Sequence, residues 1–223
     1  MVLEDYKEIV GLCAMYTTMA QMLSGTLICR NISMKGSSKG IDPMPFLGGT
    51  GLSILMLRYA WMLDDSNMIN VNIFGLLTNV IYMIIYYHYA PNTKEVIILI
   101  YKLIIFVVIF LVYAQIEHPA NIEYRFGIVV TVFLLLLIAA PLVHLKQVIK
   151  TKNTEILPFP LIFMGTLVTF QWLLYGFIID NVFIIFQNAV GFTLSIAQLS
   201  LFVIFPSKKS QDKVQNKQKK KIN

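Results

Sequence analysis

The chain has 223 residues, of which 57% are hydrophobic and only 13% are charged, and its mean hydropathy is +0.70. A soluble domain carries about 25% charged residues, so the composition excludes a free cytosolic enzyme, a disulfide-rich secreted domain and a disordered chain. The only cysteines are Cys13 and Cys29, which offer neither a disulfide framework nor a zinc site. The net charge of +6 resides in the tail, residues 207–223, which holds seven lysines and one acid.

Seven apolar stretches are long enough to cross a membrane, which takes about 20 residues. In chain order they are residues 9–29, 43–63, 66–93, 96–116, 126–145, 156–179 and 181–207. Two of them contain a cation, Arg58 in the second and Lys102 in the fourth. We expect both cations to be structural and to snorkel toward a membrane surface.

Charges between the stretches predict the orientation, because Lys and Arg favour the cytoplasmic side. The segments 30–42 and 146–155 are basic, as is the tail 207–223. The acidic connections at residues 64–65 and at Asp180 alternate with them. We therefore predict an extracellular or luminal N-terminus and a cytosolic C-terminus, with the tail solvated in the cytosol.

The sequence repeats itself at a shift of 116 residues. Without gaps, this offset aligns Gly49 with Gly165, Tyr59 with Tyr175, Asp64 with Asp180, Asn72 with Asn188, and Gly75 with Gly191. Agreement at polar as well as apolar positions indicates an internal repeat. The offset maps the first three stretches onto the last three, so the fourth must be an inverting linker between two parallel repeats.

We therefore predict an all-α integral membrane protein with seven transmembrane helices in a 3+1+3 arrangement. Its predicted parts are a first triple-helix repeat at 1–92, linker helix 4 at 93–122, a second repeat at 123–206 and a basic tail at 207–223.

Asn72 and Asn188 are the leading candidates for ligand binding, because an amide offers donors and an acceptor to a neutral, hydroxyl-bearing ligand. Each lies in the third helix of its repeat, and transporters built from repeats bind substrate near the midplane between them. Hydrogen bonding between helices is the alternative role. Trp172, in the middle of the sixth stretch, is expected either to stack on the ligand or to pack in the bundle, and Met56 is its repeat partner.

Prolines predict bends at the inner helix ends, because each removes a backbone donor. Pro45, Pro141 and Pro158 lie at such ends in the second, fifth and sixth helices. Gly25 matches Pro141 in the repeat, and we expect Gly25→Pro to be tolerated better than Pro141→Ala. The remaining hinge and gate candidates are Tyr59, Tyr175 and Asp180.

Several chemistries have no residues to carry them. The sequence has no phosphate-binding glycine loop, catalytic triad or metal-ligand spacing, so we predict no enzymatic activity, no cofactor and no metal. No pair of acids lies inside a span, which favours passive transport over ion-coupled pumping.

Several phrases resemble the SWEET (MtN3/saliva) family of sugar transporters. They are Ala140-Pro141-Leu142, Leu157-Pro158-Phe159, Trp172-Leu173-Leu174-Tyr175-Gly176 and Phe186-Gln187-Asn188-Ala189-Val190-Gly191. The resemblance covers the whole chain except the tail. Gly25 stands where the family pattern has a proline, and in this respect the chain resembles animal members of the family.

The resemblance implies bidirectional, energy-independent uniport of a mono- or disaccharide, glucose first, by alternating access. It also implies residue roles: Asn72, Asn188, Trp172 and Met56 at the sugar site, and Gly25, Pro45, Pro141 and Pro158 as hinges.

Two other functions stay open, a seven-helix receptor and a membrane scaffold that does not transport. The repeat argues against the receptor. The expected partners are the sugar and the lipid bilayer, without nucleic acid, and a homo-oligomer stays open. We expect residence in the plasma membrane, with the Golgi as the alternative.

Overall fold

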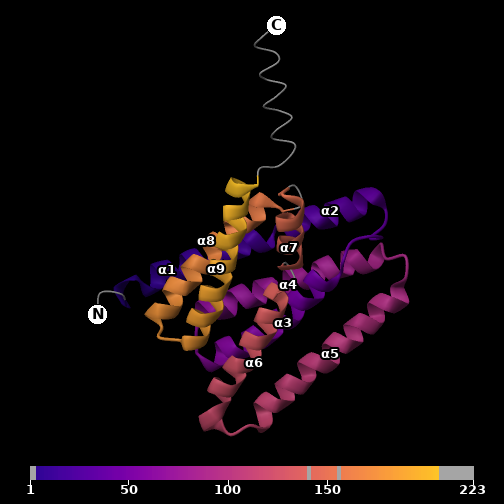
Figure 1. The fold of residues 1–223 in the computed structure, drawn as a ribbon. Coiled ribbons are helices and arrows are strands. Elements are labelled where there is room, and N and C mark those ends of the chain that lie inside the picture. The colour runs from indigo at the N-terminus through magenta and orange to yellow at the C-terminus, as the bar shows by residue number, and fades with distance from the viewer. Residues whose placement is uncertain (1–3, 140–141, 155–156, 206–223) are drawn as a thin grey trace, which may run out of the picture. The chain divides into compact units, whose positions relative to one another are not determined.

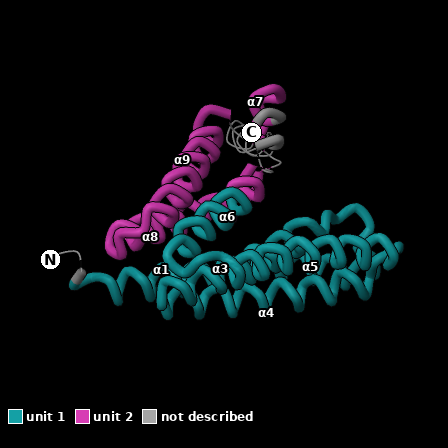
Figure 2. Tube along the Cα trace, turned by 90° about the horizontal axis from the view of Figure 1, so that it is seen from below, with its two compact units in different colours: residues 1–134 teal, residues 135–223 magenta. Residues whose placement is uncertain are grey.

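The computed structural model of the chain describes residues 4–139, 142–154 and 157–205, and every regular element in these ranges is helical (Figure 1). The chain divides into two compact units, residues 1–134 and 135–223 (Figure 2). Each unit is described by itself below.

Unit 1 is built around α4. Its elements are η1 (Glu4–Tyr6), α1 (Lys7–Met22), α2 (Gly25–Lys35), α3 (Met44–Met62), α4 (Ser66–His88), α5 (Thr93–Ile116) and most of α6 (Pro119–Ala139). Helix α4 packs against α1, α2 and α3, and α5 packs against the far side of this group through α3. The third helix of the first repeat therefore lies between the other two.

Unit 2 contains the end of α6 together with α7 (Leu142–Thr151), α8 (Phe159–Ile178) and α9 (Val182–Ile204). Helix α9 packs against α8 and α7. The same helix order as in unit 1 results, because α9 corresponds to α4 and α8 to α3.

Six helical segments of the described chain are long and apolar enough to cross a membrane. The expected second span, α3, is not one of the six, because Arg58 and several small or polar residues between Gly48 and Ser53 reduce its hydropathy. Nine of its 19 residues are buried, and small residues allow close packing between membrane helices. A helix that meets protein on most sides does not need the apolar surface of one that faces lipid.

The first span is not one helix as expected. Helix α1 ends at Met22 and α2 starts at Gly25, so the chain breaks at Leu23 and Ser24. Two predicted loops are also partly helical: α2 continues to Lys35, and α7 occupies most of the segment 146–155. In α2 the reason is its amphipathic pattern, since Cys29 and Ile32 are buried while the cations are exposed.

Matching turns precede α4 and α9. Asp64 and Asp180 both have left-handed backbone, with φ of 51° and 52°, a conformation that Asp tolerates better than most residues. The next residue caps the helix in each case: the Asp65 carboxylate accepts from Met68 N at 2.9 Å, and the Asn181 amide oxygen accepts from Ile184 N at 3.0 Å. The 116-residue offset is thus a repeat of local geometry as well as of residue types.

A second matched pair of hydrogen bonds closes the opposite end of each repeat. Ser38 Oγ donates to the Tyr89 carbonyl at 3.3 Å, and Thr154 Oγ1 donates to the Phe205 carbonyl at 2.9 Å. Ser38 and Thr154 are 0% and 1% exposed. We call each of these bonds a clasp, because it ties the segment after the broken helix to the end of the third helix of the same repeat.

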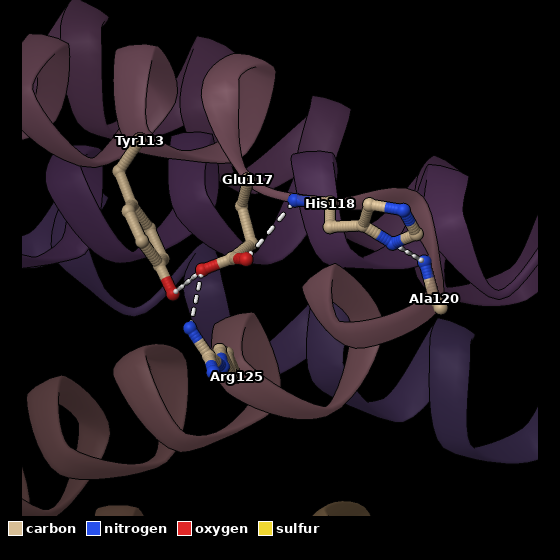
Figure 3. A network of polar contacts seen from close by, with 5 residues as sticks. All are labelled: Tyr113, Glu117, His118, Ala120 and Arg125. Atoms are coloured by element: carbon tan, nitrogen blue, oxygen red, sulfur yellow. Dashed lines mark hydrogen bonds and ion pairs between the residues drawn. The ribbon is translucent and has the colours of Figure 1, made fainter.

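A polar network fixes the connection between α5 and α6 (Figure 3). Glu117 Oε2 accepts from the Tyr113 hydroxyl at 2.8 Å and from Arg125 Nη1 at 2.7 Å, while Oε1 accepts from the His118 backbone N–H at 3.0 Å. The Tyr113 hydrogen bond is the main reason that the pKa of Glu117 lies below its ordinary value, and the His118 and Arg125 bonds act in the same direction. The carboxylate is therefore charged throughout the neutral and mildly acidic range.

We predict that Glu117→Gln lowers the thermal unfolding midpoint equally at pH 7 and pH 5. A carboxyl group with a depressed pKa contributes stability above its unfolded pKa of about 4.3, and that contribution is lost as the pH falls through the lower folded value. Differential scanning fluorimetry in detergent measures the difference from wild type, which should shrink only below about pH 4. The exposed Glu123 provides the control Glu123→Gln, which should cost little at any pH. A wild-type advantage that disappears between pH 7 and pH 5 would contradict this account.

Candidate functional site

Asn72 and Asn188 make the same hydrogen bond in their separate units. Asn72 Nδ2 donates to the Met68 carbonyl at 2.8 Å, and Asn188 Nδ2 donates to the Ile184 carbonyl at 2.8 Å. Each bond runs one turn back along the same helix, so it fixes the direction of the side chain. Asn72 is 8% exposed and Asn188 is half-buried.

Within the described chain, neither amide bonds to a second helix. This finding weighs against the role of helix-to-helix attachment. One N–H and the carbonyl oxygen of each side chain have no partner among the residues that the structure describes. The pair therefore retains a donor and an acceptor on each amide for a neutral, hydroxylated ligand.

In unit 2, Trp172 lies at the depth of Asn188. Helices α8 and α9 approach closely at Gly176, where an added Cβ would lie 3.0 Å from Ile184 Cγ2. Trp172 precedes Gly176 by four residues and Asn188 follows Ile184 by four, so on two antiparallel helices both lie about one turn, or about 5.4 Å, from the contact. The Trp172 ring is 9% exposed and meets the Tyr175 ring edge to face, with centroids 5.5 Å apart. That contact restricts the orientation of the indole.

In unit 1, Met56 and Asn72 occupy the equivalent positions on α3 and α4. The repeat partners of Gly176 and Ile184 are Ala60 and Met68, which are 0% and 2% exposed. Met56 itself is half-buried. A flexible thioether thus stands where the second repeat has a rigid indole, so the two repeats differ in shape and flexibility at this position.

Gln171 was missed by the sequence analysis. Its Oε1 is the one buried side-chain nitrogen or oxygen of the described residues that has no hydrogen-bond partner. Leaving a buried acceptor unpaired costs about 1–3 kcal/mol, so a ligand or water that donates to it would be stabilised. The repeat comparison did not find this residue because its partner, Leu55, is apolar.

Comparison with known proteins identifies the family to which the chain is similar. The model of a family described as "Sugar efflux transporter for intercellular exchange" matches twice, at residues 8–94 and 124–210. The two matches are separated by the same 116 residues as the internal repeat. A Sugar transporter SWEET1 of Drosophila pseudoobscura pseudoobscura is 36% identical over 89% of this chain and 89% of its own length.

Related proteins from other animals agree. The Sugar transporter SWEET1 of Caenorhabditis elegans is 31% identical over 94% of this chain and 69% of its own length, and the human protein of that name is 26% identical over 92% and 93%. The chain belongs to the SWEET family of sugar transporters. A solved structure of a eukaryotic SWEET transporter, 22% identical, has the same fold, with a TM-score of 0.83 over 92% of this chain and 99% of that one.

The family fold has seven helices in the 3+1+3 arrangement, which confirms the predicted fold class. It follows that α3 is a membrane span, although its hydropathy alone does not indicate one. The chain is an integral membrane protein of the animal SWEET type.

The break between α1 and α2 is held by Tyr82, another residue that the sequence analysis missed. The Tyr82 hydroxyl donates to the Met22 carbonyl at 3.1 Å and lies 3.0 Å from Thr26 Oγ1. Met22 is the last residue of α1, so Tyr82 satisfies a carbonyl that the break leaves without a helical partner. The Tyr82 ring also fills the space beside Gly25, where an added Cβ would overlap it.

This packing weighs against our expectation that Gly25→Pro is well tolerated. A proline carries a Cβ like any other substituent, so Gly25→Pro would displace the Tyr82 ring and with it the bond to Met22.

The other hinge and gate candidates have varied settings. Pro45 is the exposed second residue of α3, and Pro158 is the N-cap of α8, so both begin helices rather than kink their interiors. Pro141 lies outside the described residues. Tyr59 and Tyr175 are fully buried, whereas Asp180 is exposed. Their roles in gating stay predictions.

We predict that Tyr82→Phe lowers stability by about 1–3 kcal/mol, because it leaves the Met22 carbonyl unpaired in an apolar environment. Gly25→Ala and Gly25→Pro should both destabilise further through the clash with the ring. Thermal unfolding in detergent tests the series, with the exposed Tyr101→Phe as the matched control. If Gly25→Pro proved as stable as wild type, the close packing on Tyr82 would be wrong.

Proposed function

We propose that this chain is a bidirectional, energy-independent uniporter of a small sugar, with glucose as the first substrate to test. The observation that supports it most is the asparagine pair: two repeat-related amides, each with one N–H bonded inside its own helix and with a free donor and acceptor. Sugar hydroxyls need partners of this kind, and a neutral amide binds them without a charge to desolvate.

Alternating access would come from motion of the two triple-helix repeats against each other, with the break at 23–24 as a hinge in the first repeat. The clasps at Ser38 and Thr154 support this mechanism, because each ties one repeat within itself. In this proposal the repeats are residues 1–92 and 123–206, and residues 93–122 link them.

The proposed orientation places the N-terminus outside and the C-terminus in the cytosol. The exposed cations Arg30, Lys35 and Lys39 support it, because all three lie at the end of unit 1 where α2 ends and α3 begins. We propose the plasma membrane as the site of action, with the Golgi as the alternative, and the basic tail as a cytosolic segment.

We predict that purified protein in liposomes exchanges glucose with no ion gradient present. The measurement is counterflow: vesicles loaded with unlabelled glucose should accumulate radiolabelled glucose transiently, and a proton ionophore should leave the time course unchanged. Net accumulation driven by an imposed pH gradient would contradict the uniport mechanism. Absence of any flux, with glucose and sucrose both tested, would favour the receptor or scaffold alternatives.

We predict that Asn72→Ala and Asn188→Ala each weaken sugar binding by about 1–3 kcal/mol, or roughly 5- to 150-fold, because sugar hydroxyls then lose a buried partner. The matched control is Asn79→Ala. Asn79 makes the same one-turn bond on α4, to Gly75 at 2.8 Å, but its repeat partner is Ser195. Tryptophan fluorescence titration and counterflow, with surface expression as a folding check, separate binding from stability. Native binding in both alanine variants would remove the asparagines from the site.

A further inference from the structure

An apolar groove lies in unit 1 between α3, α4 and α5, separate from the asparagines. It encloses about 560 Å³, within the range of about 300–1,000 Å³ that is common for small-molecule pockets. Its wall presents no polar surface, and the hydroxyl of Thr50 in that wall donates to the Phe46 carbonyl at 2.8 Å. Such a wall offers no hydrogen bonds to replace those that sugar hydroxyls make with water, so the groove is not part of the proposed sugar site.

The groove extends further along α5 than along α3 and α4. Its lining spans residues 97–111 on α5, about 21 Å at the helical rise of 1.5 Å per residue. The shorter segments, residues 47–54 on α3 and 80–87 on α4, are each about 10 Å long, which fits within half of the hydrocarbon core, about 15 Å. Both segments lie at the end where α3 begins and α4 ends, which is the cytosolic end in the proposed orientation. The exposed side chains of Ile84 and Ile104 show that the groove is open to its surroundings.

A cation stands at the mouth of the groove. Ile97 is the first α5 residue of the wall, and Lys94 precedes it by three residues, which places both on the same face of the helix. Lys94 is exposed and forms no ion pair or hydrogen bond with the described residues. Among the described residues, the neighbouring Glu95 forms no ion pair with it, and Glu95 Oε1 accepts instead from Asn92 Nδ2 at 2.7 Å.

We propose that this groove binds one acyl chain of an anionic glycerophospholipid, and that the headgroup of this lipid contacts Lys94. Within the membrane this groove is surrounded by lipid hydrocarbon. An acyl chain is therefore the ligand that is both available there and matched to an apolar wall. The cytosolic leaflet carries the anionic lipids, and a basic side chain near its surface attracts them. The side chain of Asn92 caps no amide of the first turn of α5, so these N–H groups are also available to a phosphate.

Native mass spectrometry of the full-length protein tests the proposal. The purified protein is exposed to equal amounts of phosphatidylserine and phosphatidylcholine with identical acyl chains. We expect one phosphatidylserine to be retained in preference. Lys94→Gln should reduce that preference about fivefold, from the value of about 1 kcal/mol per cation near an anionic surface. Lys102→Gln is the matched control, because Lys102 is an exposed cation of the same helix that does not line the groove.

A second pair of variants tests the groove itself. Ile104→Trp should fill it and abolish retention of the lipid, whereas Ile105→Trp, at an equally apolar exposed neighbour outside the lining, should not. Photo-crosslinking of wild type with a diazirine-tagged phosphatidylserine gives the same information if a tryptophan variant fails to fold, because labels should concentrate in residues 80–87 and 97–111.

The proposal would be wrong if the protein retained no phospholipid, or if Lys94→Gln kept the preference for phosphatidylserine over phosphatidylcholine. It would also be wrong if a sterol displaced the lipid regardless of Lys94. A fourth contrary result would be an oligomer that is lost in Ile104→Trp although no lipid is bound. The last would assign the groove to a second copy of the chain. Sugar counterflow of the same variants is independent of these readouts, so failure of the lipid site leaves the proposed function to its own test.

Discussion

Lipid hydrocarbon offers no hydrogen-bond partner, so a backbone polar group that faces it in a membrane span must be satisfied inside the molecule, and much of this structure follows from that constraint. Helices α1 and α2 illustrate it. A break exposes carbonyl groups, and a side chain 60 positions away in the sequence, Tyr82, supplies a hydroxyl to the one at Met22. The bend between α1 and α2 therefore requires a specific hydrogen-bond donor on the neighbouring helix, so it depends on how α4 packs.

The same constraint explains how the candidate site is prepared for a ligand. Asn72 and Asn188 each donate one side-chain N–H to their own helix, and several threonines of α3, α4 and α8 donate their hydroxyls in the same way. After such a bond a threonine hydroxyl has no donor left and can only accept, whereas an amide retains a second N–H as well as its oxygen. An asparagine in a span is thus held in place by its helix and remains able to bind, and the repeat supplies two of them.

The sequence predicted the helical membrane architecture and the repeat because both depend on patterns that extend over many residues. Apolar length indicated the spans, and the gap-free offset of 116 identified the parallel repeats. It missed the break at Leu23 and Ser24, since no proline marks it there. It missed Tyr82 and Gln171 for a related reason: the importance of each depends on a three-dimensional neighbour, and neither has a like residue at the offset. The error at Gly25 has the same origin, because only the structure places the Tyr82 ring beside it.

The two repeats reach similar backbones by different local chemistry, and this difference bears on how they can move. In the first, a glycine leaves space for an aromatic ring, and the ring's hydroxyl caps the end of α1. In the second, Pro141 stands at the glycine position and Gln198 at the tyrosine position. A proline has no N–H and so cannot donate to the carbonyl one turn back, whatever packs around it. The bend between α1 and α2 depends instead on the hydrogen bond from Tyr82 of α4 to the Met22 carbonyl. Movement of α4 against α1 would therefore break that bond, so we expect the bend of the first repeat to be coupled to the packing of α4.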